Sequence, residues 1–156
     1  MSRLHSTFRR LIGAVDGAAA IEAALIAPVM VMLALGSFEI SNVIAKRSEL
    51  QGTMAEASGI ARASEPTSEQ RRNTVKAIIE ESSGLTAEEV TVDAAYRCGS
   101  GANYVESATG CGAAKVSSYV KIELNSTYAP LWNEFGIGGP LEQSLTRYVM
   151  IKQQAD

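Results

Sequence analysis

One apolar segment near the N-terminus constrains this chain more than any other feature. Residues 18–38 read AAAIEAALIAPVMVMLALGSF, and Glu22 is the only charged residue among them. As an α-helix this segment would be about 32 Å long, which is enough to cross the hydrocarbon core of a bilayer. The sequence therefore predicts a transmembrane helix over 18–38.

The charges on either side of the segment predict its orientation. Arg3, Arg9 and Arg10 precede it with Asp16 as the one acid, whereas the charges that follow it are mixed. Because basic residues favour the cytoplasmic side, the N-terminus is expected in the cytoplasm and the chain after residue 38 on the other side. A secretory signal and a buried core helix are the alternatives. The apolar run is longer than an ordinary signal core, and the chain has little other apolar material to cover a helix of this kind.

Glu22 needs a physical explanation, since a carboxylate inside a membrane costs a few kcal/mol unless it is hydrated or paired. Two interpretations stay open. Glu22 lies about one turn inside the span, where headgroup water could reach it. Alternatively, a cut after Gly17 would make Glu22 the fifth residue of the mature chain. Its carboxylate could then pair with the new amino group of Ala18 on the same or a neighbouring helix.

A short basic leader, Gly17, Glu22 and an unbroken apolar helix together resemble the type IV prepilin signal. Residues 9–63 are more closely similar to the TadE-like pseudopilins of the tight-adherence (Flp) pilus system. Ala23 departs from the pattern, because pilins of this system commonly carry an aromatic residue there. The features that carry the similarity are Arg9, Arg10, the run from Asp16 to Glu22, Pro28, Gly36 and Glu39.

The resemblance implies cleavage between Gly17 and Ala18 by a prepilin peptidase of the aspartyl type. It also implies a role as a minor pilin, or pseudopilin, in pilus assembly. The expected partners are that peptidase, the major Flp pilin, other pseudopilins and membrane lipid. The alternative is an unprocessed, single-pass protein whose periplasmic part binds a ligand or serves as a scaffold.

The helix is expected to continue beyond the membrane as a stalk over 39–63 and to end before Pro66, because the residue before a proline disfavours the helical conformation. Its apolar stripe could pack on the protein's own domain or form a seam between subunits. The stripe consists of Ile40, Val43, Ile44, Leu50, Met54, Ala57 and Ala61.

The remaining residues, 64–156, predict a small periplasmic α+β domain after a cytoplasmic leader over 1–17. Thr67–Gln70 reads as a capping box that opens a helix ending at Gly84. Thr86–Glu89 repeats the capping signal over a single turn. The inward-facing residues of the helix are expected to be Val75, Ile78 and Ile79.

Alternating hydrophobicity predicts an antiparallel sheet of about three strands packed on one or two helices. The first strand covers 90–98, with its even-numbered residues on one face. Val120, Ile122 and Leu124 mark the second strand. The third lies within 141–151, after a loop that prolines and glycines interrupt between 130 and 140.

Cys98 and Cys111 flank a polar loop, and both fall in the predicted periplasmic part. We expect a disulfide between them, with a pair of free thiols as the alternative. In the chain-entropy model, closing such a loop contributes about 3 kcal/mol to stability.

The composition argues against several other functions. The net charge is −3, and no block of Lys and Arg is dense enough for nucleic-acid binding. The single histidine, His5, lies in the predicted leader, so histidine-based catalysis and His-metal sites are not expected in the mature chain. Glycine turns occur without a phosphate-loop lysine. The sequence therefore predicts a protein that is not an enzyme and that takes no cofactor, metal or small-molecule substrate.

Overall fold

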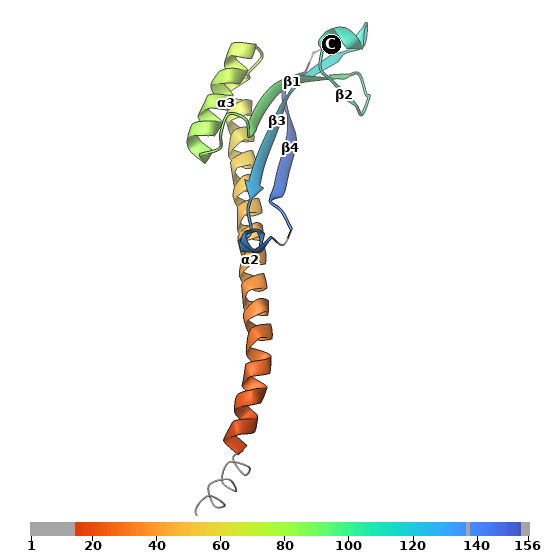
Figure 1. The fold of residues 1–156 in the computed structure, drawn as a ribbon. Helices are drawn as coiled ribbons and strands as arrows, with labels where there is room; N and C mark the ends of the chain where they lie inside the picture. Colours follow the sequence, from red (N-terminus) through yellow and green to blue (C-terminus); the bar gives the residue numbers. More distant parts are fainter. Residues whose placement is uncertain (1–14, 137, 154–156) are drawn as a thin grey trace, which may run out of the picture. The chain divides into compact units, whose positions relative to one another are not determined.

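The computed structural model describes residues 15–136 and 138–153 of the 156-residue chain. It has the predicted α+β fold, with a long N-terminal helix, a second helix and an antiparallel sheet (Figure 1). Most of the predicted leader lies outside the described residues. The helices are α2 (Val15–Ser64) and α3 (Glu69–Ser83); the strands are β1 (Val90–Cys98), β2 (Tyr104–Val105), β3 (Val116–Tyr128) and β4 (Leu141–Gln153).

Helix α2 is continuous through the predicted transmembrane segment and stalk. It ends at Ser64, immediately before the predicted break, where Glu65 takes a φ of 42° and Pro66 follows. The chain divides into two compact units, Met1–Asn42 and Val43–Asp156. The C-terminal part of α2 therefore belongs to the same unit as α3 and the sheet.

The sheet has the strand order β2-β1-β3-β4, and every neighbouring pair is antiparallel. Leu124 pairs with Val90 on one side and with Leu145 on the other, which fixes the register of the three long strands. A register shift between Ser118 and Tyr119 disturbs the β3–β4 ladder near the end of β4.

The core lies between the sheet and two helices, the C-terminal part of α2 and α3 (Figure 1). Alternate residues of each strand point to opposite faces, so one face of the sheet supplies the core and the other, called here the outer face, does not. The largest core side chains are at most 2% exposed. They are Leu50 and Met54 of α2, Val75 and Ile79 of α3, Val90 of β1, Val120, Ile122 and Leu124 of β3, and Val149 of β4.

The predicted stripe on α2 is confirmed over its C-terminal half, where Leu50, Met54, Ala57 and Ala61 pack in the protein's own core. Its N-terminal members Ile40 and Ile44 are 60% and 59% exposed and lie outside the core, which begins at Leu50. For these two residues the seam between subunits stays a prediction. Ile78 was predicted to face inward and is 43% exposed, since Val75 and Ile79 already occupy the side of α3 that meets the sheet.

Helix α3 begins one residue later than the predicted capping box requires. Ser68 is the N-cap, and its hydroxyl accepts a hydrogen bond from the backbone N–H of Arg71. A capping box needs Glu or Gln at that third position, so only the serine half of the motif is present. The predicted end is confirmed: Gly84 takes a left-handed φ of 69°, and its N–H donates to the carbonyl of Glu80.

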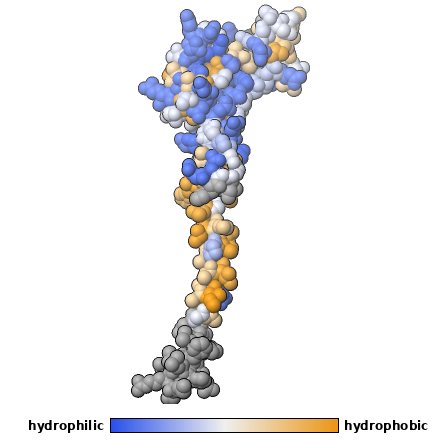
Figure 2. Space-filling model, in the orientation of Figure 1, coloured by the Kyte–Doolittle hydropathy of each residue, from blue (hydrophilic) through white to orange (hydrophobic). Residues whose placement is uncertain are grey.

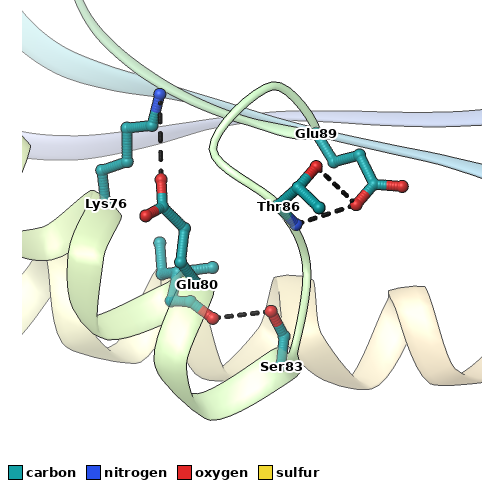
Figure 3. Close-up of polar contacts among 6 residues, drawn as sticks. Lys76, Glu80, Ser83, Thr86 and Glu89 are labelled. Carbon is teal, nitrogen blue, oxygen red and sulfur yellow. Dashed lines mark hydrogen bonds and ion pairs between the residues drawn. The ribbon is translucent and has the colours of Figure 1, made fainter.

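The turn between α3 and β1 does contain a reciprocal contact of the capping-box kind, between Thr86 and Glu89 (Figure 3). The backbone N–H and the hydroxyl of Thr86 both donate to Oε2 of Glu89, at 2.8 and 2.9 Å. The backbone N–H of Glu89 donates back to the carbonyl of Thr86. These two hydrogen bonds to the carboxylate lower the pKa of Glu89. The turn leads directly into β1, as predicted.

Three details of the sheet and its connecting loops differ from the prediction. The even-odd pattern of β1 fails at its centre, where Ala95 is 5% exposed because residues on the outer face cover it. The polar loop between the cysteines contains an additional short strand, β2. The loop between β3 and β4 contains a 3-10 helix, Leu131–Phe135. Short segments of this kind are too brief to produce a detectable periodicity.

Candidate functional sites

The predicted processing site lies within α2. Gly17 and Ala18 are both exposed, and so is Glu22. Residues four apart in a helix lie on the same face, so Ala18 and Glu22 are stacked one turn apart. An added Cβ at Gly17 would meet no atom within 4 Å. Gly17, Ala18 and Glu22 thus lie on an exposed helix surface.

The N-terminal part of α2 carries a continuous apolar surface (Figure 2). Leu25, Val29 and Met32 are between 56% and 73% exposed. Among the described residues, one helix is long and apolar enough to cross a membrane, and its span lies within Gly17–Ser64. An exposed surface of this size in water would be unfavourable, so its composition suits a single-pass membrane anchor.

Polar side chains at the C-terminal end of the apolar segment bond to the helix itself. The hydroxyl of Ser37 donates to the carbonyl of Leu33 at 2.7 Å, and that of Ser41 donates to the carbonyl of Ser37 at 2.9 Å. Because each hydroxyl has its acceptor within the helix, these serines are compatible with an apolar environment.

The second predicted site is the cysteine loop, and Cys98 and Cys111 are joined by a disulfide in the structure. The disulfide closes the loop 99–110, which forms most of an arm that we define as residues 99–115. The N–H of Gly99 donates to the carbonyl of Lys115 at 2.7 Å across the base of the arm. Gly99 and Gly112, which follow the two cysteines, take φ values of 56° and 57°. Residues with a side chain disfavour positive φ values, so glycine lets the chain turn directly after each cysteine.

Three tyrosines that sequence analysis did not select hold the arm against the outer face. Tyr104 of β2 stacks on Tyr148 of β4 with ring centroids 3.7 Å apart, and it meets Tyr119 of β3 edge to face at 5.1 Å. Tyr119 is 7% exposed. Arg97 reinforces the arrangement, because its Nε donates to the carbonyl of Gly101 at 2.8 Å and its guanidinium lies 5.8 Å from the centre of the Tyr104 ring.

No signal in the sequence could have brought these tyrosines together. They are separated along the chain and lie on three different strands. Their common position follows from the strand register and from the path of the arm.

The described residues contain no group of three or more His, Cys, Asp or Glu side chains placed to hold a metal ion. The single histidine, His5, lies outside the described residues. On the outer face, Lys121 forms an ion pair with Glu123 at 2.7 Å, and this contact raises the pKa of Lys121.

Comparison with known proteins gives one family match. The family model described as TadE-like protein matches residues 17–58, a segment that lies entirely within α2. No curated protein and no solved structure matches the chain. The matched segment is therefore similar to TadE-like proteins, which confirms the predicted resemblance, and this family is associated with the tight-adherence (Flp) pilus system.

Proposed function

We propose that this chain is a minor pilin, or pseudopilin, that takes part in assembling a tight-adherence pilus after a prepilin peptidase cleaves it between Gly17 and Ala18. The observation that carries the proposal is the family match, which begins at Gly17 and covers the exposed apolar helix. Cleavage would remove the basic leader and leave Glu22 as the fifth residue. The protein acts through its helix and its domain surfaces and catalyses no reaction.

The proposed location is the bacterial inner membrane, with residues 18–38 spanning it once. The leader, 1–17, faces the cytoplasm, and the stalk and domain, 39–63 and 64–156, face the periplasm. Two observations support this orientation. Basic residues precede the span. The C-terminal domain contains a disulfide, and disulfides persist in oxidising compartments such as the periplasm.

The proposed partners are the peptidase, the major Flp pilin, other pseudopilins and membrane lipid. The exposed apolar surface of α2 suits lipid before assembly and the apolar helices of other subunits afterwards. Glu22 is the one charged group in this surface. Its carboxylate would pair with the amino group of Ala18 on a neighbouring helix and so set the register between subunits.

Processing is the decisive test. Co-expression with the cognate prepilin peptidase should shorten the protein by 17 residues, as measured by intact mass. Gly17→Leu should block this cleavage. Because an added Cβ at Gly17 meets no neighbouring atom, the loss would reflect recognition by the peptidase and not a distorted helix.

Gly36→Leu is the matched control, since Gly36 lies in the same helix with equally open surroundings. This variant should be cleaved like the wild type. A full-length product from the wild-type chain in the presence of active peptidase would reject the pilin proposal and favour an unprocessed membrane anchor.

A further inference from the structure

A hollow of about 360 Å³ lies between helix α2 and the beginning of strand β4. Its helical wall consists of Val43 and Arg47, which are four residues apart and therefore share one face of α2. Its other wall is a continuous stretch of β4, namely Leu141, Glu142, Gln143, Ser144 and Leu145. All of these residues belong to the compact unit Val43–Asp156, so the hollow is a feature of that unit alone.

The hollow faces the free edge of β4. This strand is the last in the sheet and pairs with β3 alone. Consecutive strand residues point to opposite faces, and residues from both faces of β4 line the hollow, whereas no described residue of β3 does. The hollow therefore lies on the side of β4 that points away from β3. On that side, alternate backbone N–H and C=O groups have no strand partner among the described residues.

The charged residues that line the hollow are one base and one acid. Arg47 and Glu142 are both exposed, and neither forms an ion pair or a side-chain hydrogen bond within the described part of the chain. The adjacent Lys46 is occupied, because it is ion-paired with Glu49 at 3.0 Å. A ligand in the hollow would thus meet one free guanidinium and one free carboxylate, an arrangement that is complementary to a zwitterion.

Gln143 adds an unsatisfied polar group to the wall. Its Oε1 and Nε2 atoms are buried, and neither has a hydrogen-bond partner within the residues that the structure describes. Burial of an amide without partners is unfavourable. Rotation about the side-chain torsions would turn the amide from the wall into the hollow, and rotations of this kind are common on binding. Gln143 can therefore offer a ligand both a donor and an acceptor beside the two charges.

The helical wall of the hollow follows shortly after the predicted membrane span. Val43 and Arg47 come five and nine residues after Phe38, the last residue of that span, which corresponds to about 8 and 14 Å of helix. The headgroup layer of a bilayer extends about 5–8 Å beyond the hydrocarbon core. Helical side chains lean toward the N-terminus, so the guanidinium of Arg47 lies nearer to the span than its own Cα atom does. If residues 18–38 span the membrane, lipid headgroups are therefore within reach of the hollow.

We propose that this hollow, which we call the stalk notch, binds a phospholipid whose headgroup carries both a phosphate and a primary ammonium, namely phosphatidylethanolamine. Arg47 would donate to the phosphate oxygens, and Glu142 would accept charge-assisted hydrogen bonds from the ammonium. The Gln143 amide and the free N–H groups of β4 would bond to the remaining phosphate and ester oxygens. Val43, which is half-buried, and Leu141, which is 38% exposed, would contact the glycerol and the first acyl carbons.

The inference rests on the membrane location in the proposed function, but not on processing or on the role of Glu22. Lipid binding at the stalk notch would hold the base of the domain against the headgroups before the subunit leaves the membrane. The proposed lipid also matches both charges of the notch, whereas a purely anionic headgroup would leave Glu142 beside a like charge.

The test uses the full-length, isotopically labelled protein in dodecyl maltoside micelles, which contain no phosphate. Phosphatidylethanolamine with short acyl chains should cause saturable shifts of the Arg47 Nε–H, the Gln143 side-chain amide and the backbone amides of residues 141–145. At equal mole fraction in the micelle, phosphatidylcholine with the same chains should bind about three- to tenfold more weakly, because its trimethylammonium has no N–H to donate to Glu142.

Two further probes separate the parts of the ligand. Phosphatidylglycerol, whose headgroup has no cation, should bind at least about threefold more weakly than phosphatidylethanolamine. Free phosphoethanolamine, which has no acyl chains, should bind at least about tenfold more weakly, because it loses the apolar contacts with Val43 and Leu141.

Variants test the two charges separately. Arg47→Gln should weaken binding of phosphatidylethanolamine by about three- to tenfold. Glu142→Gln should instead reduce the preference for phosphatidylethanolamine over phosphatidylcholine to less than about twofold, since it removes the charge that the ammonium meets. Arg62→Gln and Glu56→Gln are the matched controls, because they change exposed residues of α2 that lie farther along the helix from the span. Both controls should bind like the wild type.

The proposal is overturned if phosphatidylethanolamine causes no shifts at these positions, if any of the other three probes binds as tightly, or if Arg47→Gln binds it like the wild type. Shifts of residues 141–145 that depend on protein concentration in the absence of lipid would also overturn it, since they would show that a second copy of the chain occupies the edge. The peptidase assay is independent of this titration. An uncut chain that still binds the lipid would reject the pilin proposal and keep this inference, whereas a cut chain that does not bind it would do the reverse.

Discussion

Tyr104 of β2 stacks on Tyr148 of β4, with ring planes inclined by only 7°, although β1 and β3 lie between these two strands in the sheet. The contact therefore requires the arm, whose strand β2 pairs with β1 at the edge of the sheet, to bend over the outer face so that the Tyr104 ring reaches β4. Tyr119 is buried beneath it, and the Cys98–Cys111 disulfide anchors the arm at its base. The arm is thus part of the folded domain.

The tyrosine stack should be energetically coupled. Tyr104→Ala and Tyr148→Ala should each lower the free energy of unfolding by about 1–3 kcal/mol, through lost burial and lost ring contact. In a double-mutant cycle measured by urea unfolding, the two changes should show a coupling of about 0.5–1.5 kcal/mol. Tyr104→Ala combined with Ile78→Ala should be additive, because Ile78 lies on α3 away from the outer face. Additive effects for the two tyrosines would mean that the arm does not rest on the sheet in solution.

The disulfide should stabilise the domain mainly by restricting the unfolded chain. It closes a loop with a sequence separation of 13, for which the chain-entropy model gives about 3 kcal/mol. Reduction, or replacement of both Cys98 and Cys111 by Ser, should lower the unfolding free energy by that amount. Reductant should have no effect on the double Ser variant. Alkylation of both cysteines in non-reduced protein isolated from membranes would contradict the bond.

The turn before β1 should make stability depend on acid pH. Hydrogen bonds from Thr86 lower the pKa of Glu89 in the folded state, so this contribution is fully present above the unfolded pKa of about 4.5 and is lost as the pH falls through the folded value. Glu89→Gln should cost less than about 1 kcal/mol at neutral pH, because the turn is partly solvated. The difference between variant and wild type should shrink at acid pH in urea unfolding curves.

Two isoleucines should differ in their importance for the core. Ile122 is 0% exposed and Ile78 is 43% exposed. Ile122→Ala should destabilise the domain by about 2–5 kcal/mol, since it leaves a cavity between the sheet and the helices. Ile78→Ala should cost less than about 1 kcal/mol. Equal losses in thermal or urea unfolding would show that the outer side of α3 is also covered in the protein in solution.

The role of Glu22 can be separated from membrane insertion. If its carboxylate pairs with the amino group of Ala18 on a neighbouring helix, Glu22→Ala should leave insertion and cleavage intact but reduce association with the major pilin and lower piliation. Pull-down with pilin, performed beside a cleavage assay, measures both. Glu49→Ala, on the exposed C-terminal part of α2, should leave association unchanged. If the Glu22→Ala variant forms pili like the wild type, the pairing role is rejected, and Glu22 is an acid hydrated near the headgroups.

The sequence by itself determined the features that depend on local interactions. The apolar run and Pro66 defined where α2 extends and ends, and the even-odd pattern defined β1 to the residue. Gly84 marked the end of α3, since a glycine readily takes the left-handed conformation in which its N–H bonds to a carbonyl of the last turn. The order and spacing of Arg9, Arg10, the run from Asp16 to Glu22, Pro28, Gly36 and Glu39 also pointed to the TadE-like resemblance. Each of these signals lies within a few residues of the structure that it specifies.

Only the tertiary structure decided which predicted faces are covered. Ile40, Ile44 and Ile78 fit helical periodicity as well as Leu50 or Ile79, but burial depends on how far the sheet reaches along each helix. The stack of Tyr104 on Tyr148 depends on the path of an arm whose own strand has only two residues. Contacts between residues far apart in the chain arise from register and loop path, and neither has a periodic signature in the sequence.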